Sequence, residues 1–372
     1  MQNRRDFIKL INMAALSGMA GMYSPRLLAA AAEESLCDVA RKAGLRYGSH
    51  SEIYFDYAPT PYQNLFLKHS SLYAPNLSWK LAFPQPNSNS IMWEDGNIAY
   101  ANNHNIPLTG GHLLWDLSCP SWFSGVNDPE STILNYTKAI NTKYGKNTYS
   151  WNVVNEAINI FNSRADCLDE NRFFKKMGPG YFKVAFEAAK SVAPNILRVY
   201  NDFGVELDNA NDAKKRKALL NLLDRFKKDG TPVNAVGLQS HLKLDDSQRF
   251  NEKVYRDFLT EISSRGFKIL ITEFDVSDLS TRRTDIAGRD GEVADLYKKF
   301  LSVALDEPAV KALITWGISD KYTWMNPKSD PSSVHKDKQL ARPLPFDDDF
   351  KTKPAFNALL NALKHAPKRK YL

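Results

Sequence analysis

The strongest constraint on how this chain of 372 residues folds is a repeated alternation of helical and strand patterns. The alternation is clearest in residues 211–273. Asn211 and Asp212 are suited to cap a helix whose apolar residues recur at helical spacing until Gly230 ends it. The short apolar run 233–238 follows and leads into polar residues. A helix, a glycine, a strand and then polar side chains are typical of a fold with a parallel sheet.

The same cycle continues along the chain. A second helix ends at Gly266 and leads into another apolar run. The candidate strands are 45–48, 72–74, 106–109, 149–154, 197–200, 233–238, 268–272 and 312–315. A doubly wound open sheet also alternates in this way. Eight strands, with polar residues at the ends of many of them, instead favour one α/β domain, a single (β/α)8 TIM barrel spanning residues 33–372.

The first 32 residues have the order of an export signal. Arg4 and Arg5 precede the apolar run 10–23, and small residues follow it. The paired arginines resemble a twin-arginine signal, so we expect the twin-arginine export machinery as a partner. The apolar run is shorter than the ~20 residues that a membrane span needs. We therefore predict that residues 1–32 are removed, and that the mature protein is periplasmic or extracellular without stable membrane insertion.

Charge and cysteine content exclude several classes of function. The net charge is +7, but basic residues are scattered among acidic ones except in the tail 364–370, which we expect to be a solvated end. We therefore expect no nucleic-acid partner. Cys37, Cys119 and Cys167 have neither a metal-finger spacing nor the even number of a disulfide framework. One bridge with a free thiol and no bridge at all are both compatible with three cysteines.

Cofactor and metal motifs are missing from the sequence. It contains no Gly-x-Gly-x-x-Gly, no phosphate loop, no Gly-x-Ser-x-Gly and no His-Glu-x-x-His. His112, His241, Glu273 and Asp275 are residue types that ligate zinc, but no His-x-His pair lies on one strand. We expect neither a cofactor nor a metal.

Two glutamates carry the candidate chemistry. Glu156 and Glu273 each end an apolar run, and either one taken alone could be a solvated or salt-bridged loop residue. Together they meet the needs of glycoside cleavage, which requires a proton for the leaving oxygen and an anion for the oxocarbenium-like transition state. The carboxylate with hydrogen-bond donors nearby stays ionised. We therefore predict that Glu273, with His241 as its partner, is the nucleophile and that Glu156 is the acid/base.

Several motifs occur in the order found in a known family. The segments 151–157 (WNVVNEA) and 271–276 (ITEFDV) resemble the acid/base and nucleophile motifs of glycoside hydrolase family 10, the endo-1,4-β-xylanases. Segments 111–115, 237–241 and 316–320 resemble the family's strand-3, strand-6 and strand-8 motifs, and 353–356 resembles its closing motif. The resemblance runs from about residue 60 to 360. It implies a retaining, endo-acting hydrolase of xylan on a barrel.

The resemblance also implies roles for individual residues. Asn155 would bond the 2-hydroxyl of the sugar beside the cleaved bond, and His241, contacted by Asp275, would hold the nucleophile. His112 and Gln239 would line the central subsite. The aromatic walls of the cleft would be Trp115, Trp316 and Trp324. Each tryptophan could equally be a core residue, and each histidine could be a satisfied structural one.

One segment departs from the family pattern. The strand-2 motif reads Glu-Asn-x-x-Lys-Trp in the family and supplies polar contacts to the non-reducing-side sugars. If Trp79 is matched, the lysine becomes Ser78 and the glutamate becomes Ala74. A one-residue bulge would let Asn76 and Lys80 substitute. A site that loses such donors loses discrimination.

Three interpretations therefore remain. The first is a xylanase. The second is a hydrolase of another β-linked polysaccharide, such as a bacterial exopolysaccharide. The third is a non-catalytic carbohydrate-binding barrel. All three have a polysaccharide as partner, and we expect a monomer. The sequence leaves open the sugar, the endo or exo cleavage pattern, the oligomeric state, the cysteine pairing and the signal cleavage site.

Overall fold

The computed structural model describes residues 34–86, 88, 94–326 and 338–372. The predicted signal at residues 1–32 lies outside these ranges, and Ser35–Leu372 forms one compact unit. Within the described ranges, no helix combines the length and the apolar character needed to cross a membrane.

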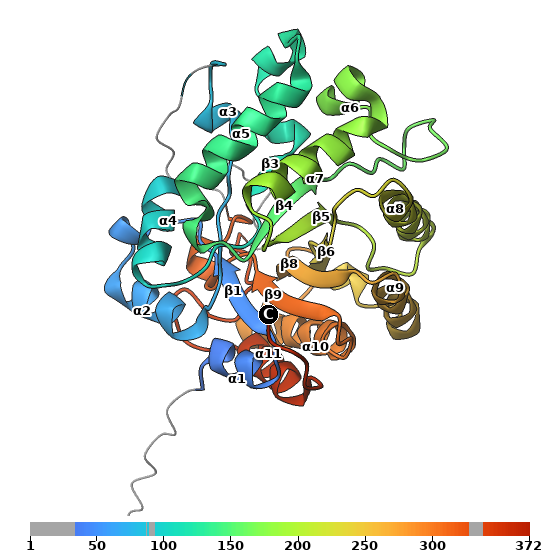
Figure 1. Ribbon diagram of the computed structural model, residues 1–372. Helices are drawn as coiled ribbons and strands as arrows, with labels where there is room; N and C mark the ends of the chain where they lie inside the picture. The colour runs from blue at the N-terminus through green and yellow to red at the C-terminus, as the bar shows by residue number, and fades with distance from the viewer. Residues whose placement is uncertain (1–33, 87, 89–93, 327–337) are drawn as a thin grey trace, which may run out of the picture. The chain divides into compact units, whose positions relative to one another are not determined.

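Parallel strands form the centre of this unit (Figure 1). They are β1 (Arg46–His50), β2 (Tyr73–Ala74), β3 (His112–Leu114), β4 (Ser150–Asn155), β5 (Leu197–Asp202), β6 (Ala235–Leu238), β8 (Lys268–Ser277) and β9 (Val310–Thr315). They pair in the order β2-β1-β9-β8-β6-β5-β4-β3, and the short β7 (His241–Lys243) extends the edge of β8. Leu108 makes parallel bridges to Tyr73 and to Thr148 and so closes the ring between β2 and β4. The predicted (β/α)8 barrel is confirmed.

The third strand differs in detail from the expectation. Residues 106–109 contribute only the bridge at Leu108, and the regular strand begins at His112. Gly110 and Gly111 lie between them with φ of 81° and 61°, a left-handed backbone that glycine adopts without steric cost. A side chain on Gly111 would lie 2.8 Å from the Trp151 ring. The two glycines therefore interrupt the strand and let it pass close to β4.

Alternation along the strands produces two apolar layers. The smaller cluster fills the ring and consists of Leu72, Ala74, Leu197, Val199, Ala235, Leu270, Ala312 and Ile314. The larger cluster includes neighbouring residues such as Tyr200 and Ile269 and packs the helices on the outside. Both faces of the strands are thus buried, as is usual for parallel sheets.

Helices surround the strands in Figure 1. The described helices are α1 (Leu36–Lys42), α2 (Thr60–His69), α3 (Trp79–Ala82), α4 (Glu94–Asn103), α5 (Pro129–Tyr144), α6 (Arg172–Met177), α7 (Tyr181–Val192), α8 (Ala210–Lys228), α9 (Glu252–Ser264), α10 (Ile286–Ala304) and α11 (Pro354–His365).

The start of α8 was predicted two residues late. Its N-cap is Asn209, whose side chain accepts from the Asp212 N–H, and Asp212 instead accepts from the Leu207 N–H. Asn and Asp both cap well, so the run Asn209 to Asp212 offers several candidates and the sequence does not rank them. Gly230, at φ 66°, follows the C-terminus as predicted.

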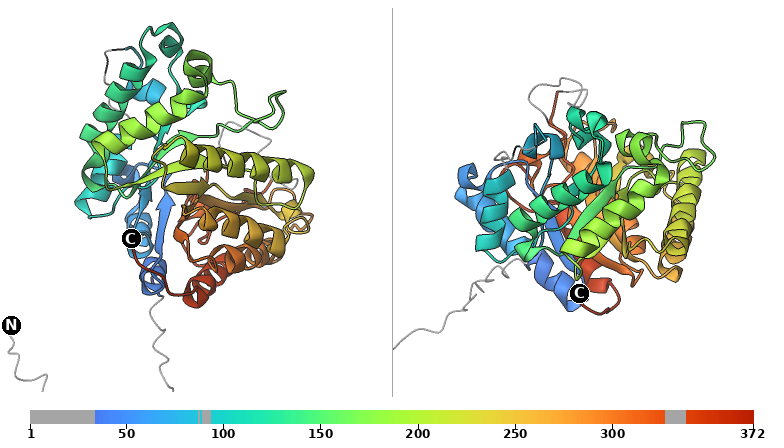
Figure 2. Two further views of the ribbon diagram at one scale, coloured as in Figure 1. Left: turned by 45° about the vertical axis from the view of Figure 1, so that its right-hand side comes forward. Right: turned by 45° about the horizontal axis from the view of Figure 1, so that its top comes forward.

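The C-terminal tail was expected to be solvated, which holds for Lys364, His365, Lys368 and Lys370 but not for Arg369. The Arg369 guanidinium donates to the carbonyls of Leu305, Glu307 and Val310. The Arg369 carbonyl lies 1.8 Å from where a Cβ on Gly44 would be, so only glycine fits there. Both views of Figure 2 place α1 and α11 at the same end of the molecule. Arg369 therefore ties the tail to the segment that leads into β9 and, through its N–H, to the Ala43 carbonyl between α1 and β1.

The three cysteines are all free thiols in this structure. Cys37, Cys119 and Cys167 are buried in the core, and burial raises the pKa of the Cys37 thiol and raises that of Cys119 to about 12. Thiols with raised pKa values react poorly, so Cys37 and Cys119 behave as small apolar core residues.

Candidate active site

The carboxyl ends of the strands surround a cavity of about 620 Å³ that contains most of the predicted site. Eight of the ten predicted site residues line it: His112, Trp115, Glu156, Gln239, His241, Glu273, Trp316 and Trp324. The other two, Asn155 and Asp275, are buried directly behind these residues and hydrogen-bond to their neighbours. The structure therefore brings all ten residues together from β3, β4, β6, β7, β8 and β9.

Glu273 is a buried carboxylate held by several donors. It lies inside β8, and its Oε2 is 3.2 Å from His241 Nε2. The Asn201 amide donates to Oε1 at 2.9 Å, and His112 Nε2 is 3.6 Å from the same oxygen. Burial alone would raise the pKa of Glu273, but the bonds from His112 and His241 outweigh it and hold this pKa well below the usual value. Glu273 is therefore ionised throughout the ordinary pH range.

His241 links Glu273 to a second carboxylate. Its Nδ1 is 2.9 Å from Asp275 Oδ1, and the Trp324 indole donates to Asp275 Oδ2 at 2.8 Å. Burial would lower the pKa of His241, but Asp275 and Glu273 together raise it well above 6.5. Both ring nitrogens are thus occupied by carboxylates, as in a charged histidine and unlike a neutral metal ligand. Among the described residues, no group of three or more His, Cys, Asp or Glu side chains is placed to hold a metal.

Glu156 has a different environment. It follows β4 with φ 56°, a left-handed conformation that costs a non-glycine residue roughly 1–3 kcal/mol and persists when its surroundings enforce it. Its N–H donates to the Asn201 carbonyl at 2.9 Å. The Trp115 indole donates to Oε2 and the Gln239 amide to Oε1, both at 2.8 Å. Both side-chain donors are neutral, so Glu156 lacks the cationic partner that fixes the charge of Glu273.

Asn201 joins the two halves of the site and was not among the predicted residues. Its amide nitrogen donates to Asn155 Oδ1 at 2.8 Å as well as to Glu273, and its oxygen accepts from Thr272 Oγ1 at 2.8 Å. Asn155 keeps its own buried amide donors without a partner in the described part of the chain. The sequence did offer one indication, because Asn201 follows an apolar run in the same way as Asn155.

The altered segment after β2 is anchored by Trp79. Trp79 is buried and stacks on Tyr136 with ring centroids 4.1 Å apart, so it fixes the register of α3. Ser78, which was expected at the family's lysine position if Trp79 is matched, has a buried hydroxyl without a partner among the described residues. The predicted substitution through a bulge holds only in part. Asn76 lines the cavity, whereas Lys80 does not and donates to the Leu117 carbonyl.

Phe203 and Glu52 are among the lining residues that were not predicted. Phe203 is 46% exposed and lies over the Lys215 ammonium, 3.8 Å from the ring centroid, while Lys215 pairs with Asp202 at 2.7 Å. Glu52, two residues after β1, also lines the cavity. No motif pointed to Glu52, because its neighbours in the sequence match none of the family segments.

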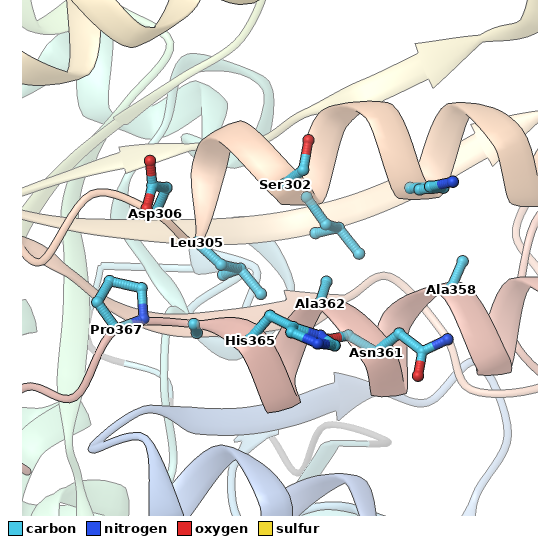
Figure 3. Close-up of a pocket in the computed structure, with 11 residues that line it drawn as sticks. Ser302, Leu305, Asp306, Ala358, Asn361, Ala362, His365 and Pro367 are labelled. Carbon is cyan, nitrogen blue, oxygen red and sulfur yellow. The ribbon is translucent and has the colours of Figure 1, made fainter.

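A second hollow of about 500 Å³ lies between α10 and α11 (Figure 3). Leu305, Ala358 and Ala362 form much of its wall. Asp306 pairs with Arg256, and His365 Nδ1 is 2.8 Å from the Asn361 carbonyl of its own helix. It contains no pair of facing carboxylates and none of the predicted site residues. The cavity at the strand ends is therefore the candidate active site.

The fold and this cavity define a barrel enzyme with paired carboxylates, and comparison with known proteins identifies its class. Residues 35–362 match the family described as Glycosyl hydrolase family 10, so the chain belongs to that family and is a glycoside hydrolase. The expected family is thus confirmed.

Relatives and solved structures agree with this assignment. The chain is 25% identical over 302 residues to "Endo-1,4-beta-xylanase B" of Thermotoga neapolitana, covering 79% of this chain and 80% of that protein. It is 26% identical over 329 residues to "Exoglucanase XynX" of Acetivibrio thermocellus, covering 82% of this chain but only 28% of that protein. The crystal structure of native xylanase 10B from Thermotoga maritima superposes with a TM-score of 0.76 at 24% identity, covering 89% and 98% of the two chains.

Proposed function

We propose that this protein is a retaining, endo-acting β-1,4-xylanase in which Glu273 is the nucleophile and Glu156 the acid/base. One observation carries the proposal: two carboxylates line one cavity but have opposite surroundings. Glu273 is buried and contacted by His241 and His112, whereas Glu156 is held by neutral donors. A fixed anion and a carboxyl that can carry a proton are the two groups that glycoside cleavage needs.

The reaction follows from these positions. A Glu273 oxygen attacks the anomeric carbon as the bond from that carbon to the leaving oxygen breaks, and the Glu156 proton passes to that oxygen. In the second half, water attacks the same carbon, its proton returns to Glu156, and the bond to Glu273 breaks. His241 and Asn201 keep the Glu273 carboxylate oriented. The free amide donors of Asn155 are suited to a hydroxyl of the bound sugar.

The substrate and cleavage pattern rest on the relatives. The Thermotoga neapolitana protein is named as an endo-1,4-β-xylanase, and its match extends over most of both chains. The test is incubation of the protein with xylan and a panel of other β-glycans, followed by product sizing. We expect xylan to be converted first to a ladder of oligosaccharides. Release of only one short product would contradict the endo pattern, and no turnover of any glycan would contradict both enzymatic interpretations and favour a non-catalytic binder.

A hydrolase of a different β-linked polysaccharide is the second candidate. Ala74 and Ser78 stand where the family has a glutamate and a lysine, and the structure leaves the Ser78 hydroxyl buried without a described partner. The same panel separates the two, because this candidate predicts faster turnover of another β-glycan than of xylan.

We also propose export by a twin-arginine signal and a monomeric mature protein. The export proposal rests on Arg4 and Arg5 ahead of a short apolar run. Replacing both arginines by lysine should leave the full-length protein in the cytoplasm of the expressing cell, measured by fractionation. Continued export would point to a different route. Light scattering of the mature protein gives its mass, for which we expect that of one chain.

A further inference from the structure

The β1 end of the cleft carries a polar pair that neither the sequence motifs nor the proposed mechanism uses. His50 ends β1, and Glu52 follows two residues later. His50 Nε2 is 3.1 Å from Glu52 Oε1, and His50 Nδ1 is 2.8 Å from the Ala74 carbonyl on β2. The His50 side chain is fully buried, whereas that of Glu52 is 31% exposed and lines the cavity. Glu52 therefore presents its carboxylate to the cleft, and His50 lies buried behind it.

The surroundings fix this carboxylate in place. Ser51 between the two residues donates to the Ile53 carbonyl at 2.9 Å and accepts from the Tyr62 hydroxyl at 2.9 Å. Burial acts to raise the pKa of Glu52, but the bond from His50 lowers it below its usual value, so Glu52 is an anion at neutral pH. Within the described residues, Glu52 Oε1 is held by His50 while Oε2 has no hydrogen-bond partner.

His50 also supports an aromatic wall of the cleft. Its ring stacks on Trp316 with centroids 4.3 Å apart and planes 13° apart. Trp316 lines the cavity beside Glu52 and Asn76. An indole face with nearby hydrogen-bonding groups is a common way to bind a pyranose, because the ring carbons pack on the indole while the hydroxyls reach polar side chains.

The position of Glu52 in the ring of strands indicates which sugar of the bound chain it would contact. The leaving sugar is attached to the oxygen that Glu156 protonates, and Glu156 follows β4. Glu52 follows β1, which is separated from β4 by β2 and β3 in one direction. Glu52 therefore lies on a different side of the cavity from Glu156, where a sugar on the side away from the leaving group would be in reach. Ala74 and Ser78 supply no charged group on that side.

We propose that Glu52 is a specificity-determining residue that accepts hydroxyl hydrogen bonds from the neutral sugar next to the reacting one, on the side away from the leaving group. This assignment rests on the proposed xylanase function. His50 is a positioning residue that holds both the Glu52 carboxylate and the Trp316 ring. An anion at this point also disfavours a sugar that bears a carboxylate, because like charges repel in a partly desolvated site.

The test compares two aryl glycosides with the same leaving group, an aryl β-xyloside and an aryl β-xylobioside. Only the second places a sugar beside the reacting one. In Glu52→Gln we expect kcat/KM for the bioside to fall by about tenfold or more, because a hydrogen bond to a charged group is stronger than one to a neutral amide. The monoside should change by less than about twofold, and this constancy also shows that the variant is folded. Glu130→Gln, an exposed residue of α5, is the matched control.

A third substrate tests the charge directly. For an aryl bioside whose terminal sugar is a uronic acid, Glu52→Gln should raise kcat/KM relative to the neutral bioside. Equal losses on monoside and bioside, or an unchanged ratio of acidic to neutral bioside, would overturn the assignment in an enzyme that remains active. No turnover of either neutral glycoside by the wild type would instead overturn the xylanase proposal, and with it the role of Glu52.

Discussion

The two sides of the cleft are built differently. On the side of β4, β5, β6, β7 and β8, two groups of side chains, Gln239 with Glu156, and Asn201 and His241 with Glu273, are joined by main-chain hydrogen bonds into one network. On the side of β1 and β2, the structure has instead the local pair His50 and Glu52, with Asn76 nearby. The first side matches the family motifs and the second does not.

This difference indicates that the reaction and the preference for a sugar depend on different residues. Main-chain bonds connect the two carboxylates. The Glu156 N–H donates to the Asn201 carbonyl, and the Asn201 side chain donates to Glu273. In return, the Glu273 N–H donates to the Gln239 carbonyl, and the Gln239 side chain donates to Glu156. Displacing one member therefore disturbs both carboxylates. Glu52 can change without moving either of them. Reaction type and substrate preference should thus respond to different substitutions.

Loss of the nucleophile should have the largest effect. Glu273→Ala removes the attacking oxygen, and we expect kcat on an aryl glycoside to fall by roughly 10⁴-fold or more. Added azide should restore turnover and give a glycosyl azide of inverted configuration, identified by NMR. Residual activity above about a tenth of wild type would show that Glu273 does not attack.

Loss of the acid should depend on the leaving group. In Glu156→Gln we expect kcat/KM to fall by about 10²- to 10⁴-fold on xylo-oligosaccharides, whose leaving alcohol needs a proton. Aryl glycosides with acidic phenols should lose far less. Glu170→Gln, an exposed glutamate in the loop after β4, is the control. Equal losses on both substrate types would remove Glu156 from this role.

Removal of the His241 charge should shift the pH dependence. His241 lowers the pKa of Glu273, so in His241→Asn the Glu273 pKa rises and the carboxylate becomes protonated as the pH falls. The acidic limb of kcat/KM, which reports ionisation of the free enzyme, should move to higher pH, so the loss of kcat/KM should grow as the pH falls. His104→Asn is the matched control, because His104 is an exposed histidine at the end of α4. A uniform loss across pH would contradict the electrostatic role.

The smallest effect is expected from Lys80. Its ammonium bonds the Leu117 carbonyl and does not line the cavity, so Lys80→Ala should change kcat/KM for the aryl bioside by less than about twofold. Asn76→Ala, a lining residue, should lower the same value by a few-fold, because a neutral hydrogen bond contributes about 1 kcal/mol. A larger loss in Lys80→Ala than in Asn76→Ala would show that Lys80 replaces the missing family lysine.

The sequence predicted the parts of this molecule that depend on local pattern. Apolar runs located the strands except the third, which begins at His112 and not within 106–109, and the polar residues that follow these runs located Glu156 and Glu273. The same logic did not find Glu52, because it follows β1 without a motif and acquires meaning only when the ring places it beside Trp316 and Asn76. The hydrogen bonds of Arg369 were also missed, since its carbonyl partners are about sixty residues away in the sequence. Long-range pairing of this kind has no local signature.

The most direct test of the account is covalent trapping. A 2-deoxy-2-fluoro xylobioside with a good leaving group forms the glycosyl-enzyme rapidly and hydrolyses slowly, because fluorine destabilises the oxocarbenium-like transition state. Intact-mass and peptide mass spectrometry should show one added glycosyl unit per chain, attached to Glu273 and absent from Glu273→Ala. An adduct on any other residue, or turnover of the unmodified bioside with inversion and no adduct, would contradict the mechanism.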